Sequence, residues 1–188
     1  MKQTITNELQ AHIKTFQSFD TLTRTIEEAA TLLIHSLTQG KKVILFGNGG
    51  SAADAQHISA ELVGRYKSER KALPAITLTT DTSALTSIAN DFGYKQVFAR
   101  QLEGLANTGD CVIAISTSGN SANVLEAIST AKAKKCFVIG FTGKEGGAMR
   151  EQCDICLCVP SSDTPRVQEG HIFIGHTLCQ LIEDSLSV

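Results

Sequence analysis

The sequence predicts an α/β fold in which a parallel β-sheet is covered by helices on both faces. Five short apolar runs follow the first forty residues, and they span residues 43–46, 75–78, 111–115, 136–141 and 155–159. These runs recur at a spacing of roughly twenty to thirty residues, filled mostly by helix-like segments, which is the pattern of βαβ units. Three of the runs are followed by a turn rich in glycine or hydroxyl residues, which then leads into a helix.

The two ends of the chain are predicted to be helical. Residues 1–40 contain no proline and no glycine before Gly40, and their apolar residues recur at helical spacing, so this segment predicts one or two helices. A last helix is expected to run from about Pro165 into the terminal stretch LIEDSLSV. No linker interrupts the sequence, and its length suits one domain over residues 1–188.

Composition and charge exclude several classes of protein. A formal net charge of -2 leaves no broad basic face, so no nucleic-acid partner is expected and an anionic ligand must be held locally. No apolar run approaches the roughly 20 residues that span a bilayer, so no membrane partner is expected. Six cysteines without an apolar leader segment indicate free thiols in a reducing, cytoplasmic environment.

The three turns after the apolar runs predict where a ligand binds. They have the sequences GNGGSA at 47–52, STSGNSA at 116–122 and TGKEGG at 142–147. In an open parallel sheet, ligands collect at the carboxyl ends of the strands, where such turns meet the starts of helices. Any α/β protein needs tight turns at this edge, so the third turn is equally consistent with a purely structural role.

The first turn, GNGGSA, matches the glycine pattern of dinucleotide binding only weakly. Gly47, Gly49 and Ala52 occupy the expected positions after a strand. A nicotinamide site would also need an acidic residue at the end of the second strand, about twenty residues further on. Asp81 lies well beyond that distance, which disfavours a dinucleotide.

The second turn favours a phosphate monoester. Its hydroxyl side chains precede a helix, and hydroxyl groups together with the unpaired amides of a helix start can hold phosphate without lysine. The turn lacks the G-K-[ST] ending of a nucleoside-triphosphate loop. The alternative is that Ser121 or Asn120 only caps the helix.

Acidic and imidazole side chains on two distant helices suggest acid/base or metal chemistry. His57 and Glu61 lie four residues apart, so they project from one helix face, and Asp54 could orient His57. Exposed pairs of this kind are also common on helix surfaces. On the terminal helix, Gln168 and His176 interrupt an apolar pattern on roughly the same side, although a buried histidine is often structural.

The cysteine cluster CDICLC, residues 153–158, does not predict a zinc site. Cys156 and Cys158 share one face of a candidate strand as small apolar residues, and the chain has no second C-x-x-C pair.

Taken together, these segments resemble the sugar isomerase (SIS) family and, within it, the bacterial phosphoheptose isomerases. The resemblance covers nearly the whole chain. It depends on GNGGSAADAQH, AEL.GRY, ANDFG, ISTSGNSANV and R.QE.HI..GH, in that order. The family implies a three-layer, flavodoxin-like sandwich with a five-stranded parallel sheet. It also implies a homotetramer whose N-terminal helices, residues 1–40, pack together and whose active sites lie at subunit interfaces.

Matching the family motifs residue by residue implies a set of site residues. The sugar would contact Asn48, Gly49, Gly50, Ser51, Asn90 and Asp91, with Glu61 and Gln168 also touching substrate. The phosphate would be held by Ser116, Thr117, Ser118 and Ser121. One zinc ion per subunit, or another divalent metal, would be bound by His57, Glu61, Gln168 and His176. Glu61 and His176 would also be the acid/base pair.

The resemblance implies conversion of sedoheptulose 7-phosphate to D-glycero-D-manno-heptose 7-phosphate through an enediol. This would be the first step of ADP-heptose synthesis for lipopolysaccharide. A non-catalytic SIS relative that binds the replication initiator is the alternative. That relative departs from the Glu and terminal His pattern, whereas this sequence retains both Glu61 and His176.

Overall fold

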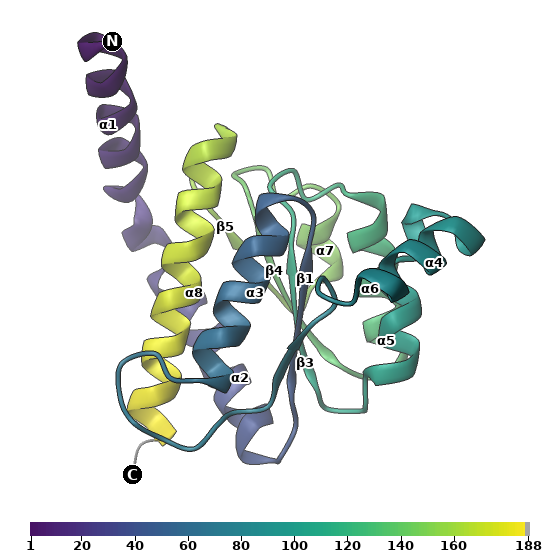
Figure 1. The fold of residues 1–188 in the computed structure, drawn as a ribbon. Coiled ribbons are helices and arrows are strands. Elements are labelled where there is room, and N and C mark those ends of the chain that lie inside the picture. Colours follow the sequence, from purple (N-terminus) through teal and green to yellow (C-terminus); the bar gives the residue numbers. More distant parts are fainter. Residues whose placement is uncertain (187–188) are drawn as a thin grey trace.

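The protein, described as a computed structural model over residues 1–186, contains one five-stranded parallel sheet (Figure 1). The strand order is β2-β1-β3-β4-β5, the doubly wound order in which the chain reverses direction beside β1. The strands are β1 (Val43–Gly47), β2 (Ala75–Thr77), β3 (Cys111–Ile115), β4 (Phe137–Thr142) and β5 (Ile155–Cys158). Each predicted apolar run therefore coincides with a strand, with ends that differ by at most one residue.

Helices form a layer on each face of the sheet, which confirms the predicted three-layer α/β fold (Figure 1). One face is covered by α2 (Thr23–Thr38), α3 (Gly50–Val63) and α8 (Thr164–Leu186). The other is covered by α4 (Thr82–Phe92), α5 (Ala99–Leu105), α6 (Ala122–Ala133) and α7 (Met149–Gln152). The N-terminal helix α1 (Lys2–Phe16) and two short 3-10 helices, η1 (Phe19–Leu22) and η2 (Tyr94–Gln96), complete the described elements.

The strands are apolar throughout because both faces of the sheet are buried. In β1, Val43 and Leu45 point into the core beneath α2, α3 and α8, whereas Ile44 and Phe46 point into the core on the opposite side. This alternation follows from the two-residue period of a strand. The same sequence pattern would expose apolar side chains in a sheet covered on one face only.

The terminal helix begins at Thr164, one residue before Pro165, as predicted. Proline suits the first turn of a helix because its missing N–H would have no partner there. The predicted helix extends through Leu186, and the remaining residues of LIEDSLSV, 187–188, lie outside the described part of the chain.

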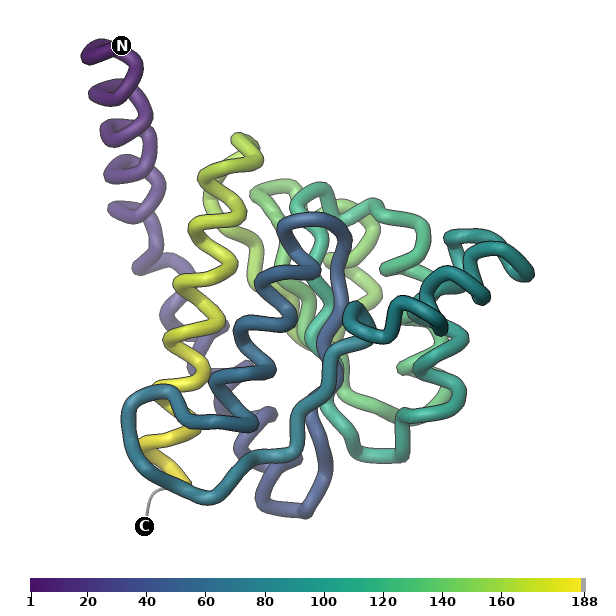
Figure 2. Tube along the Cα trace, viewed as in Figure 1, coloured from purple at the N-terminus to yellow at the C-terminus, as the bar shows by residue number. Residues whose placement is uncertain are grey.

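Helices α3 and α8 lie side by side and run in the same direction (Figure 2). A Cβ atom on Gly175 would lie 2.5 Å from Ile58 Cδ1, and one on Gly50 would lie 2.8 Å from Gln168 Nε2. Gly175 therefore lets the Ile58 side chain enter the helix–helix contact. These two contacts lie at different positions along the helix axes, and together they fix the register of the two helices.

Helix α1 (Lys2–Phe16) projects away from the body of the protein (Figure 1). Its solvent-facing stripe carries Ile5, Leu9 and Ile13, with exposed fractions of 70%, 54% and 38%. At its carboxyl end, His12 Nδ1 lies 2.8 Å from Glu169 Oε2, which links α1 to α8. The predicted N-terminal helices are thus α1 and α2, joined by η1.

Two further expectations concern the thiols and the membrane. All six cysteines are unpaired in the structure, as expected for free thiols. Among residues 1–186, no helix is both long enough and apolar enough to cross a bilayer.

The buried imidazole of His171 predicts acid-sensitive stability. Burial lowers the pKa of His171 from 6.5 to about 4, against a smaller opposing influence of the Thr142 backbone. Between these values the unfolded chain binds the proton more readily, so stability falls as pH falls from 6.5 towards 4. At pH 4.5 the loss from this residue should be about 2 to 3 kcal/mol relative to pH 7.5. Urea unfolding of the wild type and His171→Leu at both pH values measures it, and an equal pH dependence of the two proteins would contradict it.

Candidate active site

The first predicted loop connects β1 to α3 at the carboxyl edge of the sheet. Gly49 has φ of +57°, a backbone conformation that favours glycine, and it precedes the first residue of α3. The amide N–H of Ser51 donates to the carbonyl oxygen of Asn48 at 3.0 Å, so the turn closes directly onto the helix. Gly49 and Gly50 are exposed, whereas Ser51 is buried.

A pair of asparagine amides joins the first loop to the second. Asn48 Nδ2 donates to Asn123 Oδ1, and Asn123 Nδ2 donates to Asn48 Oδ1, both at 2.8 Å. The hydroxyl of Tyr94 also donates to Asn48 Oδ1 at 3.2 Å. Asn48 is therefore held by two other parts of the chain. Neither Asn123 nor Tyr94 was predicted from the sequence, although an amide in the first turn of a helix beside a polar loop was a usable signal for Asn123.

The second predicted loop begins directly after β3 and ends at the start of α6. Ser116 Oγ and Ser121 Oγ lie 2.9 Å apart, so these hydroxyls from the two ends of the loop meet. Ser121 is the N-cap residue of α6, but its side chain makes no capping hydrogen bond. The Asn120 side chain instead accepts from the Ala148 amide at 2.9 Å. Simple helix capping by Ser121 or Asn120 therefore does not account for the polar side chains of this loop.

The third turn, TGKEGG, packs against the backbone of the second loop. Gly119 has φ of +67°, and a Cβ atom there would lie 2.0 Å from the carbonyl oxygen of Gly146. The amide of Gly143 donates to the carbonyl oxygen of Thr117 at 3.0 Å, and that of Met149 donates to Gly119 at 3.1 Å. The two loops pack backbone against backbone, which fixes the shape of the hydroxyl-lined loop.

Three side chains from α3 and α8 converge beside the helix–helix contact. His57 Nε2 lies 3.3 Å from Glu61 Oε1 and 3.0 Å from His176 Nε2. One ligand atom from each of the three residues lies within 4.8 Å of the others. Because His57 and His176 are 119 residues apart in sequence, only the packing of α3 against α8 brings them together.

This cluster can exchange protons or bind a cation. The two Nε2 atoms can share a hydrogen bond only if one carries a proton and the other a lone pair. With both lone pairs free, two imidazole nitrogens and a carboxylate oxygen form a donor set that suits zinc. Nearby, burial raises the pKa of Asp54, and the charge of His57 opposes that shift.

The structure places three other predicted residues away from this cluster. Gln168 precedes His176 by eight residues, about 12 Å along α8, and contacts the first loop at Gly50. Asn90 and Asp91 lie on α4, exposed, where Asn90 Nδ2 donates to Asp91 Oδ1 at 2.8 Å. Helix α4 stands apart from α3 and α8 (Figure 1).

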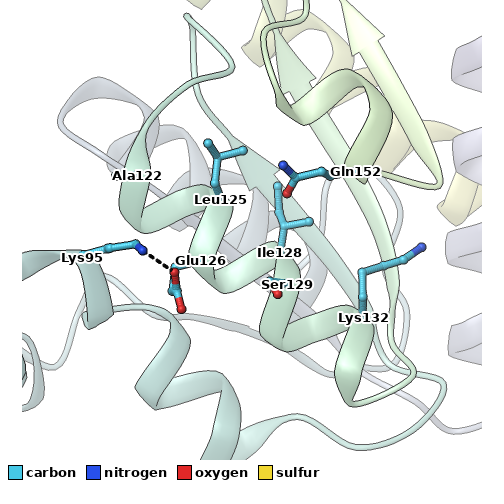
Figure 3. A pocket seen from close by; sticks show the side chains of 8 residues that line it. All are labelled: Lys95, Ala122, Leu125, Glu126, Ile128, Ser129, Lys132 and Gln152. Carbon is cyan, nitrogen blue, oxygen red and sulfur yellow. Dashed lines mark ion pairs between the residues drawn. The ribbon is translucent and has the colours of Figure 1, made fainter.

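Two surface hollows differ in their relation to these residues. One, of about 310 Å³, is lined by His176, Tyr66 and residues on the outer side of α8. The other, of about 690 Å³, lies on the outer side of α6, where Lys95 forms an ion pair with Glu126 at 2.8 Å (Figure 3). None of the predicted site residues lines this second hollow, so its size alone does not make it the active site.

Comparison with known proteins shows the family of the chain and its fold. The family model described as "SIS domain" matches residues 7–143. The phosphoheptose isomerase of Campylobacter concisus is 58% identical over 98% of both chains, and that of Aliarcobacter butzleri is 55% identical over the full length of both. The structure of the Neisseria gonorrhoeae phosphoheptose isomerase superposes with a TM-score of 0.93 at 40% identity, covering 97% of this chain and 98% of the other.

The chain belongs to the phosphoheptose isomerases of the SIS family. It is therefore an enzyme of the sugar-phosphate isomerase class, as the sequence resemblance implied. The comparisons do not favour the non-catalytic adaptor. The predicted five-stranded parallel SIS fold is likewise confirmed.

Proposed function

We propose that this isomerase converts sedoheptulose 7-phosphate to D-glycero-D-manno-heptose 7-phosphate. The proposal is carried by the convergence of Glu61 and His176, which come from helices far apart in the sequence. The helix that bears Glu61, α3, starts directly after the loop that follows β1. The full-length relatives are named phosphoheptose isomerases, which supports a heptose phosphate as the substrate.

The second loop would hold the phosphate group. Ser116, Thr117, Ser118 and Ser121 offer hydroxyl donors at the start of α6. The positive end of the helix dipole favours a dianion there without a lysine. Asn48 joins this loop to the first one, so the sugar chain would extend from the phosphate along residues 48–51.

Glu61 would carry the proton between carbons 1 and 2. Its carboxylate removes the proton from C1, the C–H electron pair forms the C1=C2 bond of an enediol, and the carbonyl oxygen on C2 gains a proton. The enediol then takes a proton from Glu61 at C2 as the hydroxyl on C1 loses its proton. His176 would exchange the protons at the two oxygens, because an imidazole changes charge near neutral pH.

A divalent metal, one per subunit and by our proposal zinc, fits the cluster. His57, Glu61 and His176 supply two nitrogens and one oxygen. Gln168, which the family pattern adds as a fourth ligand, lies nearer the N-terminus of α8, beside the first loop. Such an ion supplies Lewis-acid polarisation of the carbonyl group. A carboxylate engaged by a cation is a weaker base, so Glu61 would have to be free of it while it accepts the carbon proton.

We further propose that the enzyme acts in the cytoplasm, at the first step of ADP-heptose synthesis for lipopolysaccharide, and that it assembles as a homotetramer. Unpaired thiols support a reducing compartment. The apolar stripe of α1 supports an assembly, because Ile5, Leu9 and Ile13 lie on one face of a projecting helix. Asn90 and Asp91, on the outward α4, would reach substrate hydroxyls within that assembly.

Glu61→Gln should lower kcat for sedoheptulose 7-phosphate at least about a hundredfold, the effect of losing a general base. The amide keeps the shape of the side chain, so binding of phosphate should persist. Glu151→Gln, an exposed carboxylate on α7, is the matched control and should retain wild-type turnover. Solvent deuterium should enter the product at C1 or C2 in the wild type. Unchanged turnover in Glu61→Gln would remove this residue from the mechanism.

His57→Ala and His176→Ala should each weaken zinc binding by about tenfold or more, since even an outer-shell partner of a metal site commonly costs this much. Calorimetric titration of chelator-treated protein with zinc measures the affinity directly. The control is His35→Ala, an exposed imidazole on α2 outside the cluster, which should bind zinc as the wild type does. Equal affinity in all four proteins would show that zinc binds elsewhere.

Replacing the apolar stripe of α1 by the pair Ile5→Ser and Leu9→Ser should reduce the tetramer to smaller species. Burial of these side chains against other copies would be lost, at roughly 25 cal/mol for each Å² of apolar surface. Light scattering coupled to gel filtration gives the mass. The pair Thr4→Ser and Asn7→Ser, exposed on the face of α1 opposite the stripe, is the control. A tetramer of unchanged stability in the Ile5/Leu9 variant would exclude this stripe from the interface.

A further inference from the structure

Glu183 is a buried carboxylate on α8, seven residues after His176, with an exposed fraction of 1%. Its oxygens accept hydrogen bonds from three successive backbone amides, those of Tyr66 at 2.7 Å, Lys67 at 2.9 Å and Ser68 at 2.9 Å. These amides belong to the segment that follows α3 and passes over the carboxyl-terminal part of α8 (Figure 2). The Glu183 side chain therefore binds the backbone of residues 66–68, the turn after α3.

Arg70 connects the same carboxylate to the end of α3. Its Nε lies 3.2 Å from Glu183 Oε1, and this ion pair is buried on both sides. Its two terminal nitrogens donate to the carbonyl oxygens of Glu61 at 2.7 Å and of Leu62 at 2.8 Å. Carbonyls in the last turn of a helix have no partner within the helix, so Arg70 satisfies two of them.

Glu183 is held in its charged form by these donors. Burial alone would raise the pKa of Glu183, but the three amides and the Arg70 guanidinium outweigh burial and lower the pKa. Such an arrangement is expensive to build, because apolar side chains of similar size often stabilise a fold equally well. Stability alone therefore does not explain why the Glu183–Arg70 pair is buried at this position.

Tyr66, the first residue of the turn, stacks on His176. The ring centroids lie 5.4 Å apart with an interplanar angle of 29°, and Lys67 Nζ lies 5.0 Å from the Tyr66 centroid. The Nε2 atom of the same imidazole contacts His57. Tyr66 thus limits the orientations in which His176 can meet His57 and Glu61.

We propose that Glu183, Arg70 and Tyr66 are positioning residues of this isomerase: the Glu183–Arg70 pair, anchored to the end of α3, holds the Tyr66 ring against the His176 imidazole. The inference rests on the proposed roles of Glu61 and His176 in proton transfer. The ion pair itself meets the cluster only at the backbone carbonyl of Glu61, so its effect on the His176 side chain would pass through the Tyr66 ring.

The test is a double-mutant cycle in turnover of sedoheptulose 7-phosphate. Tyr66→Leu should lower kcat about tenfold with little change in KM, by analogy with the loss of a residue that orients a metal-binding histidine. Tyr66→Phe keeps the ring and should restore kcat. Glu183→Gln should also lower kcat, and adding it to Tyr66→Leu should lower kcat no further, because both act through one ring. Asp184→Asn, an exposed neighbour whose carboxylate accepts a hydrogen bond from the Gln180 amide, is the control and should turn over normally.

Wild-type kcat in Tyr66→Leu would overturn the proposal, and so would equal losses in Tyr66→Leu and Tyr66→Phe. If Glu183→Gln folds, losses that multiply in the double variant would also overturn it, because they would show two independent effects. If Glu183→Gln does not fold, the two Tyr66 variants decide alone. Glu61→Gln in the same assay separates the two hypotheses: full activity there rejects the proton-transfer role of Glu61, whereas a loss confined to Tyr66→Leu still supports the positioning of His176.

Discussion

The parallel contact between α3 and α8 is the constraint on which the rest of the site depends. Gly175 lacks a side chain where Ile58 enters, so the two helices approach closely and in one register. Well-packed contacts of this kind have few alternative arrangements, because a shift of one residue would drive side chains into one another. The register brings His57 and Glu61 of one helix to His176 of the other.

The 116–122 loop and the His57–Glu61–His176 cluster differ in the charge of their side chains. The loop proposed to hold the phosphate offers neutral hydroxyls and backbone amides, and glycines at 119 and 147 let the third turn, residues 142–147, pack closely against it. The α3–α8 cluster gathers two imidazoles and a carboxylate instead, all of them partly exposed to solvent. Under the proposed mechanism, the loop would anchor the substrate without reacting and the cluster would supply the base.

Much of this could be predicted from the sequence, because the signals are local. Apolar runs without alternation indicated strands buried on both faces, and glycines after those runs indicated the turns at the carboxyl edge. The four-residue spacing of His57 and Glu61 placed them on one helix face. The family resemblance, carried by motifs with many residues each, gave the five strands and the isomerase class that the comparisons support.

The sequence by itself determined the elements, the turns and the residues able to do chemistry, since each follows from neighbours along the chain. Only the tertiary structure decided which of them meet. It placed His176 against His57 but Gln168 against Gly50, it paired Asn48 with Asn123, and it joined Glu183 to the turn after α3. Those partners are separated by seventy-five residues or more, and the relative height of two packed helices is set by side-chain volumes across their contact, which no local pattern encodes.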